Sequence, residues 1–524
     1  MPVTLGLLLT LSFVVSLLAL GFLIWAIANR QITMNQSSAT TIFAPGEEGH
    51  IDNKGTETGD GHQHVFDPVK TGIDAVSARP VIWLLAAAIV WLLLGSGFGI
   101  VASLKLHLPD WLNSRAELTF GRIRTLHLNM VAYGWVSQAG LACVFWIIPR
   151  IFRTRLRLPR LTYIGLVLWN AALLGGMIAV ATGWTDGEEW LEIPWQFDIG
   201  LAIAGVFFAI PLVLTTRARE VHHIYVSGWY FLAGLLWFPV IFVVANIPFI
   251  HWGVEEATVN WWFAHNVLGL WITPLAVGTA YYFIPKIIGR PIYSYAVSLL
   301  GFWGLALFYS QVGIHHLIGG PVPTWLVTLS IVHSVMMFVP VIAVAVNHHI
   351  TVARNLWALK ESVPLRFVWF GALMYTAASF QGANQALRSV NSVTHFTHYT
   401  VGHAHLGVYA FASVVFFGAA YHLLPHATGR SFRWPGLIKA HFWSVMIGFA
   451  IYFFALSIGG VLQGLAMLDA TRPFADSVIL MKPYLEARTI GGSLMTLGHV
   501  LFAVNFFSIL VASRTDSARA EAAA

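Results

Sequence analysis

Hydrophobic residues in this chain fall into long blocks separated by short polar stretches. Each block holds about 20 apolar residues, the length that an α-helix needs to cross the hydrocarbon core of a bilayer. The pattern predicts an all-α polytopic membrane protein rather than a barrel, with thirteen spans at 5–29, 80–103, 125–149, 161–182, 197–214, 226–249, 260–284, 292–314, 323–347, 366–386, 399–424, 438–463 and 491–512.

A polar stretch separates the first block from the other twelve. Residues 30–78 include the run GEEGHIDNKGTETGDGHQH, which predicts a flexible cytoplasmic linker. We expect an N-terminal transmembrane anchor at 1–29, this linker at 30–78, a twelve-helix core at 79–513 and a cytoplasmic tail at 514–524. The first block is interpreted as a retained anchor, because no charge precedes its apolar run and it shows no clear small-residue cleavage site.

The composition supports a membrane protein and limits its covalent chemistry. Of 524 residues, 57% are hydrophobic and only 10% are charged, which a soluble core of this size does not need. The single cysteine, Cys143, excludes an internal disulfide, and the chain has no CxxCH motif. Any c-type haem that works with this chain must therefore belong to a partner.

The basic residues gather in alternate loops rather than in one patch. Arginine and lysine are concentrated at 149–160, 215–220, 285–290, 353–360, 426–433 and after 512, whereas the loops at 185–194 and 251–260 are acidic. By the positive-inside rule the basic loops are cytoplasmic and the acidic loops face outward. The net charge of +6 therefore orients the chain in a lipid bilayer and does not indicate a nucleic-acid partner.

Histidines stand inside several apolar blocks, where an ionisable side chain is costly and indicates function. In the stretch VTHFTHYTVGHAHLG (393–407), His403 and His405 are two residues apart. Such residues point about 200° apart on an α-helix, so they cannot easily share one metal ion. They can each give an axial nitrogen to one of two flat groups on opposite faces of the helix, and haem is the natural candidate.

Three further histidines predict a second kind of centre. His315 and His316 lie in GIHHL at a helix end, and His265 lies in the preceding span. Three imidazoles with an open position suit copper, iron or zinc, so the ligand type leaves the metal open. His127 follows Arg122 and Arg124, whose guanidinium groups suit haem propionates. The isolated His333, His441 and His499 are interpreted as packing residues.

Several motifs together carry a family resemblance. TFGRIRTLH, HHIYVSGWYF, NWWFAHNVLG, YYFIPKIIGRPIYSY, FYSQVGIHHL and SVN…HYTVGHAHLG occur in an order and spacing that resemble the catalytic subunit (subunit I) of the cbb-type cytochrome c oxidases, the C family of haem-copper oxygen reductases. The resemblance covers residues 79 to 513. It implies a twelve-helix haem-copper oxidase core, preceded here by one extra transmembrane helix.

The resemblance implies a role for each of these residues. His127 and His405 would be the axial ligands of a low-spin haem b, and His403 the proximal ligand of a high-spin haem b. One copper ion would be held by His265, His315 and His316, and Tyr309 would be the tyrosine cross-linked to His265. Arg122 and Arg124 would meet haem propionates. A possible calcium ion would use Glu192, with Glu189 compensating for a family acid that is replaced by Pro194.

The implied activity is that of a terminal respiratory oxidase in the bacterial cytoplasmic (inner) membrane, with its haems toward the periplasmic side. It would reduce dioxygen to water with electrons from membrane-anchored c-type cytochrome subunits and a soluble cytochrome c or similar donor, coupled to proton uptake and pumping. Tyr309 would supply one electron and one proton. Polar groups on the spans predict a proton path through Ser298, Tyr281, Tyr295, Ser330, Ser334 and Asn347. Gln381 replaces a glutamate of the family near His403, and we expect this exchange to raise the potential of the high-spin haem.

Two alternatives compete with this function. A nitric oxide reductase places iron opposite the haem and uses a glutamate one turn after the first histidine, where this chain has Gly269. That glycine, together with Tyr309, favours copper and dioxygen. A polytopic transporter also fits twelve apolar spans, but it does not explain six matching histidines.

Overall fold

A computed structural model of the chain describes residues 17, 20–44, 47–48 and 68–511. Apart from an isolated bridge between Glu188 and Leu191, the regular structure in these ranges is helical, so the prediction of an all-α fold is confirmed. Eleven helices in the described ranges are long and apolar enough to cross a membrane. The predicted span at 366–386 corresponds to α14 (Val363–Gln385), which is not among the eleven. The predicted first span lies largely outside the described residues, as does the predicted tail.

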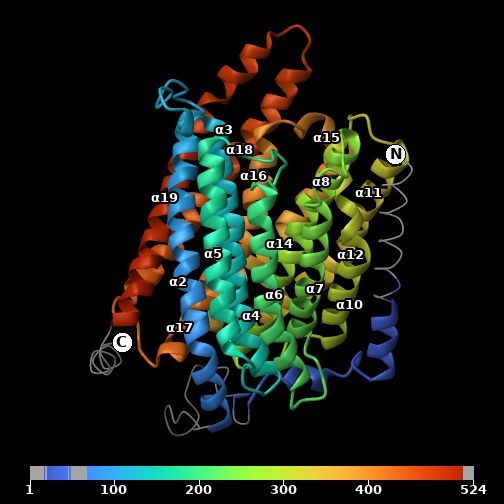
Figure 1. Ribbon diagram of the computed structural model, residues 1–524, viewed down its shortest axis with the longest axis vertical. Coiled ribbons are helices and arrows are strands. Elements are labelled where there is room, and N and C mark those ends of the chain that lie inside the picture. The colour runs from blue at the N-terminus through green and yellow to red at the C-terminus, as the bar shows by residue number, and fades with distance from the viewer. Residues whose placement is uncertain (1–16, 18–19, 45–46, 49–67, 512–524) are drawn as a thin grey trace.

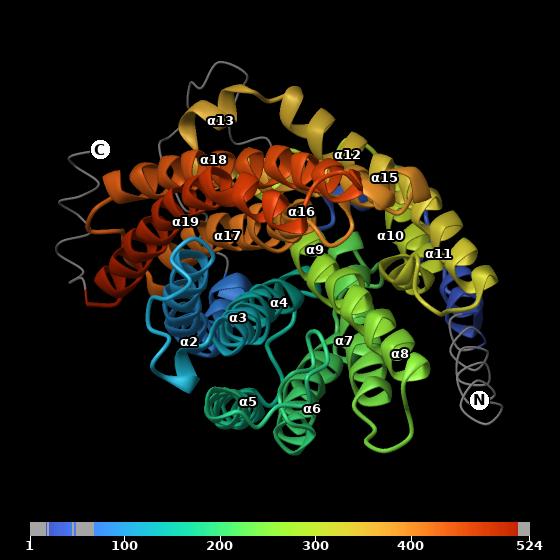
Figure 2. The same cartoon turned by 90° about the horizontal axis from the view of Figure 1, so that it is seen from above.

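The helices run roughly parallel in one bundle, from whose end the connection between α18 and α19 projects (Figure 1), and α5 and α6 stand side by side at one margin (Figure 2). Besides α14, the helices are α2 (Pro68–Lys105), α3 (Phe120–Asn129), α4 (Ser137–Ile151), α5 (Pro159–Thr182), α6 (Trp195–Arg217), α7 (Val226–Ala245), α8 (Val254–Asn266), α9 (Thr273–Ile288), α10 (Tyr295–Phe308), α11 (Thr324–Met336), α12 (Phe338–Ala353), α13 (Trp357–Glu361), α15 (Arg388–Thr394), α16 (His398–His405), α17 (Val414–Thr428), α18 (Gly436–Leu468) and α19 (Phe474–Val511). Short 3₁₀ segments are η1 (Gln36–Thr40), η2 (Ala116–Leu118) and η5 (Tyr309–Leu317).

Apolar side chains cover the outside of the bundle as well as its core. Val167 is 67% exposed and Leu307 is 66% exposed, as expected for helices whose solvent is lipid. Small residues let the helices approach closely inside. A Cβ at Gly448 would lie 2.7 Å from the carbonyl oxygen of Gly491, so this pair allows α18 and α19 to pack backbone against backbone.

Three of the long helices contain a π-helical segment, and each segment follows closely after one of the predicted ligand histidines. The segments are η3 (Met130–Val136), η4 (Val267–Ile272) and η6 (Leu406–Ser413). They begin three residues after His127, two after His265 and directly after His405. A π-helical turn widens the helix locally and is frequent at functional sites. The π-helical segments therefore lie next to the histidines that the sequence predicts to be ligands.

The described part of the predicted linker packs against the core instead of extending freely from it. The side chain of Gln31 is fully buried, donates to the carbonyl oxygen of His222 at 2.9 Å and accepts from the Ile224 amide at 3.0 Å. Gln36 donates to the carbonyl oxygen of Ile292 at 2.7 Å. Glutamine amides can pair with backbone groups that the core leaves open, so a polar stretch is ordered here. The first core helix, α2, also begins earlier than the predicted boundary at 79.

Candidate functional site

His127 and His405 face one another as a pair of parallel rings. Their ring centroids are 6.2 Å apart and the ring planes differ by 12°. Nδ1 of His127 lies 2.8 Å from the carbonyl oxygen of Gly95, and Nδ1 of His405 lies 2.9 Å from that of Val401. Because a carbonyl oxygen only accepts, each Nδ1 carries the hydrogen and each Nε2 has the lone pair that a metal ligand needs. In this structure the Tyr452 hydroxyl lies 3.1 Å from Nε2 of His405.

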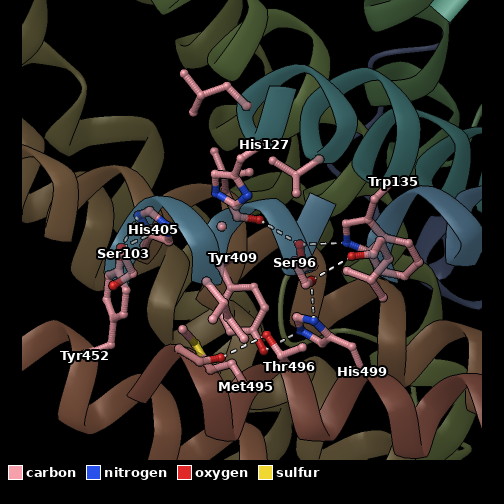
Figure 3. A pocket seen from close by; sticks show the side chains of 18 of the residues that line it. Ser96, Ser103, His127, Trp135, His405, Tyr409, Tyr452, Met495, Thr496 and His499 are labelled. Carbon is pink, nitrogen blue, oxygen red and sulfur yellow. Dashed lines mark hydrogen bonds between the residues drawn. The ribbon is translucent and has the colours of Figure 1, made fainter. Parts of the chain in front are cut away.

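A cavity lies beside these rings (Figure 3). It measures about 880 Å³ including the open space at its mouth. Two bonds of about 2 Å from a metal to imidazole nitrogens, plus half a ring on each side, come to about 6 Å, which matches the observed ring separation. The residues present therefore fit a flat metal-bearing group held by two axial imidazoles.

The positively charged side chain in the cavity wall is not one of the two arginines predicted from the sequence. The predicted propionate partners do not line the cavity: Arg122 donates to the carbonyl oxygen of Ala181 at 3.1 Å, and Arg124 pairs with Glu189 at 2.6 Å. Arg488 lines it instead. It was missed because it lies on the last helix, far along the chain from the histidine motifs.

Other polar groups in the wall are already paired with one another. Arg488 donates from Nε to the Tyr452 hydroxyl at 3.1 Å. His499, predicted to be a packing residue, lies 2.8 Å from the Ser96 hydroxyl and 2.9 Å from the Tyr409 hydroxyl, so both of its ring nitrogens have partners (Figure 3). His499 therefore shapes the cavity but offers no free ligand nitrogen.

The other three predicted metal ligands converge on one point. One ring nitrogen from each of His265, His315 and His316 lies within 4.8 Å of the other two, and within the described ranges this is the one such group of three His, Cys, Asp or Glu side chains. The ring centroid of His265 lies 4.9 Å from that of His315 and 5.4 Å from that of His316. The arrangement suits a single small ion with imidazole ligands.

Hydrogen bonds hold His315 in the orientation that a ligand needs. Its amide donates to Ser330 Oγ at 2.8 Å, and its Nδ1 lies 3.0 Å from Ser334 Oγ. Ser334 Oγ donates to the Ser330 carbonyl oxygen at 2.8 Å and therefore accepts from His315 Nδ1. This leaves Nε2 of His315 for a metal. Ser330 and Ser334 position this histidine, and their predicted place in a proton path stays a prediction.

The remaining two imidazoles of this group are also constrained. His316 stacks on Trp261 with ring centroids 4.2 Å apart. Nδ1 of His265 is buried and has no hydrogen-bond partner in the part of the chain that the structure describes. A buried nitrogen rarely lacks a partner, so this atom points to a ligand that it would hold.

Tyr309 lies against the helix that carries His265. Its ring centroid is 5.2 Å from that of His265, at an interplanar angle of 44°. A Cβ at Gly269 would lie 1.7 Å from two carbon atoms of the Tyr309 ring. The tyrosine ring therefore occupies the space that any side chain at position 269 would need.

His403 belongs to the other side of α16 from His405. Its Nδ1 lies 3.1 Å from Gln381 Oε1, an acceptor, so Nδ1 carries the hydrogen and Nε2 is available. His403 is within electrostatic range of all three histidines of the cluster. The service of two different centres by His403 and His405 stays a prediction.

The other predicted proton-path residues lie at the start of α10 and on the adjacent α9 and α12. The Tyr295 hydroxyl lies 2.6 Å from His223 Nε2, and Ser298 Oγ donates to the Tyr295 carbonyl oxygen at 2.6 Å. Asn347 donates to the Ser294 carbonyl oxygen at 2.8 Å, and the ring of Tyr281 is buried. His223 is an additional member of this group that the sequence did not single out.

The predicted calcium ligands lie in the loop before α6. Asn129 donates to Glu192 Oε2 at 2.9 Å, whereas Glu192 Oε1 is buried without a partner in the described ranges. Burial raises the pKa of Glu192 to about 7. Glu189 is paired with Arg124 at 2.6 Å, and a calcium ion shared by the two acids stays a prediction.

Comparisons with known proteins agree on one family. The family model described as cytochrome c and quinol oxidase polypeptide I matches residues 79–494. The chain is 32% identical to a cbb3-type cytochrome c oxidase subunit CcoN1 of Stutzerimonas stutzeri, covering 84% of this chain and 96% of that protein. It is 28% identical to a cytochrome c oxidase subunit 1 homolog of Azorhizobium caulinodans, covering 97% and 95%. A solved heme-copper terminal oxidase dimer, 16% identical, shares the fold with a TM-score of 0.70 over 85% of each chain.

Proposed function

Because the chain belongs to the cytochrome c and quinol oxidase polypeptide I family, as subunit I of a cbb3-type cytochrome c oxidase, we propose how its residues divide dioxygen reduction. His127 and His405 would hold a low-spin haem b for electron transfer. His403 would hold a high-spin haem b, and His265, His315 and His316 would hold one copper ion. When bound, the haems and copper supply the electron transfer and the dioxygen-binding position.

The protein residues set protons and orientations around these groups. Gln381 accepts the His403 Nδ1 hydrogen and so directs Nε2 toward the metal position. Ser334 does the same for His315. Tyr309 holds a proton at its hydroxyl beside His265, where reduction of dioxygen to water requires one. Together these contacts fix the donor atoms before any metal arrives, which reduces the reorganisation needed during turnover.

The single observation that supports copper and dioxygen best is the contact between Gly269 and Tyr309. A nitric oxide reductase of this superfamily would need a glutamate side chain at position 269, yet a Cβ there would lie 1.7 Å from the Tyr309 ring. A glutamate side chain at position 269 and the Tyr309 ring in its present place therefore exclude one another sterically. A tyrosine in this place is the feature expected of an oxygen reductase, so nitric oxide reduction is the weaker alternative.

We further propose that protons enter from the side of the basic loops. Tyr295, Ser298, Tyr281 and Asn347 lie toward the ends of helices that lead into those loops, and 14 residues of helix, about 21 Å, separate Tyr295 from Tyr309. Electrons come from c-type cytochromes on partner subunits, because the chain has no CxxCH motif. Calcium is left out of this proposal, since Glu189 is paired with Arg124.

The test is the copper content per polypeptide of the purified complex, set against protohaem and combined with rates of dioxygen and nitric oxide consumption. We expect one copper and two b haems, with dioxygen as the faster substrate. One non-haem iron in place of copper would indicate nitric oxide reduction instead of dioxygen reduction. A colourless preparation would support the transporter alternative.

A further inference from the structure

A histidine that none of these assignments uses lies buried beside the proposed proton path. His348, on α12, is only 2% exposed. It stands six residues before Arg354, about 9 Å along the helix from the basic loop. Its Nε2 is buried and has no hydrogen-bond partner in the described ranges. An imidazole inside a membrane protein is costly, and one with an unpaired nitrogen needs an explanation.

Two tyrosine hydroxyls with the same property belong to the ring next to this histidine and to the ring that follows it. The ring of His348 meets the ring of Tyr281 edge to face, with centroids 4.3 Å apart. Tyr281 in turn stacks with Tyr230, with centroids 5.9 Å apart. Both hydroxyls are buried and without a partner among the described residues. Three helices, α7, α9 and α12, thus each present one such polar atom to the same region.

The nearest amide satisfies these groups at most in part. Asn347 lies beside Tyr281, but one Nδ2 hydrogen is donated to the Ser294 carbonyl oxygen at 2.8 Å and Oδ1 accepts from the Ser294 amide at 2.8 Å, which leaves a single Nδ2 hydrogen and one lone pair. Buried polar atoms that lack protein partners are usually bridged by ordered water, each molecule making about three hydrogen bonds. His348, Tyr281 and Tyr230 have the chemistry to hold such a water cluster.

We propose that His348 is a proton-transfer residue that passes protons from this cluster toward Tyr281. The inference rests on the proposed function, because it places His348 on the path to Tyr309. One proton is taken up at Nε2 and one is released to the next water, so the imidazole returns to its neutral form. Imidazole is the side chain best suited to exchange protons near neutral pH, whereas tyrosine is not.

The surroundings of His348 are compatible with this exchange. The titratable groups that act on it are Tyr281 from α9 and His349 from its own helix. Nε2 of His349 lies 3.0 Å from Thr376 Oγ1, and its Nδ1 is buried without a partner among the described residues. Beyond Tyr281, Tyr375 on α14 lies within electrostatic range of both Tyr281 and Tyr309, so the path has a continuation toward the metal cluster.

The experiment uses the complete oxidase complex in vesicles and compares His348→Phe with His349→Phe. We expect His348→Phe to slow proton uptake and dioxygen reduction about tenfold and to change the pH profile of turnover, with haem and copper contents unchanged. Added imidazole should restore part of the rate in His348→Gly. The matched variant His349→Phe should behave as the parent protein.

Each other outcome has a definite meaning. Parental turnover and an unaltered pH profile in His348→Phe would overturn the inference, as would the same slowing in His349→Phe. If His348→Phe loses haem or copper, His348→Gln must show the slow uptake with intact cofactors. Tyr281→Phe distinguishes a failure of the proposed proton path from a failure of the role of His348. Parental rates in Tyr281→Phe would overturn the proton path itself. Slow rates in Tyr281→Phe together with parental rates in His348→Phe would overturn only the role of His348.

Discussion

The two histidine centres of this protein are built in opposite ways. At the first, the ring centroids of His127 and His405 stand 6.2 Å apart, with nearly parallel ring planes, beside a cavity that opens to the outside. At the second, nitrogen atoms of His265, His315 and His316 gather within 4.8 Å of one another. The first arrangement leaves room for a large flat group, and the second leaves room for a single ion.

The difference teaches how each centre is stabilised. The proposed haem pocket depends on the separation of the two rings, and each Nδ1 is anchored to a backbone carbonyl oxygen, that of Gly95 on α2 for His127 and that of Val401 on α16 for His405. The proposed copper site depends on close packing, since Tyr309 fills the space above Gly269. Removing a histidine ligand should therefore impair cofactor binding at either centre. Adding a side chain should impair the proposed copper site far more than the proposed haem pocket.

The largest effects should come from removing one ligand at each centre. His265→Ala should lose copper and reduce dioxygen consumption by more than about 100-fold, since even the loss of an outer partner costs 10–100-fold. His405→Ala should lose the low-spin haem and retain copper. Metal analysis and absorption spectra of the purified complex measure both. Loss of copper and both haems in each variant would show that the two centres are not independent.

The next effect tests the packing contrast directly. Gly269→Ala brings a Cβ to 1.7 Å from the Tyr309 ring, so the tyrosine must move. A displacement of about 1 Å near the reacting groups can cost about 100-fold in rate, and we expect a loss of 10- to 100-fold in dioxygen reduction. Gly407→Ala is the matched control, because its Cβ would meet nothing within 4 Å although it lies two residues after His405. Equal losses in the two variants would contradict the contrast.

Much of this architecture could be predicted from the sequence, because membrane helices depend on long apolar blocks and ligands on one residue type. The histidines of both centres and Tyr309 were identified from spacing and resemblance, and the structure brings His265, His315 and His316 together. The spans from 80 onward coincide with helices, although α2 begins at Pro68. Local patterns were sufficient wherever the signal lay within one helix.

Features that depend on contacts between distant segments could not be predicted. Arg488 lines the haem-like cavity from α19, and no spacing in the sequence links it to His127. Ser330 and Ser334 were expected in the proton path because they are polar, but their partners are groups of His315. Gln31 was assigned to a flexible linker because its neighbours are polar, yet it is fully buried. Polarity alone does not distinguish a solvated group from a paired one.

A smaller effect should distinguish the haem proposed to bind His403, on one face of α16, from the haem proposed to bind His405, on the other face. Gln381→Glu places a carboxylate at the position from which Gln381 Oε1 now meets His403 Nδ1 at 3.1 Å. A carboxylate makes the imidazole a stronger donor to iron, so the potential of the high-spin haem should fall by on the order of 50 mV. The low-spin haem, held by His405, should keep its potential. Redox titration followed by absorption checks both values, and an unchanged high-spin potential would count against the role of Gln381.

The smallest effect on turnover concerns pH at the buried carboxyl group of Glu192. Asn129, two residues after His127, binds the buried Glu192, whose pKa is raised by burial to about 7 from 4.5. The folded protein therefore binds a proton that the unfolded chain releases between about pH 4.5 and 7. Stability is highest below that window and falls as pH rises through it, by on the order of 3 kcal/mol in total. Glu192→Gln should remove this slope without changing copper content. Melting temperatures of the complex between pH 5 and 8 measure the slope, and an equally steep fall in the variant would assign it to another group.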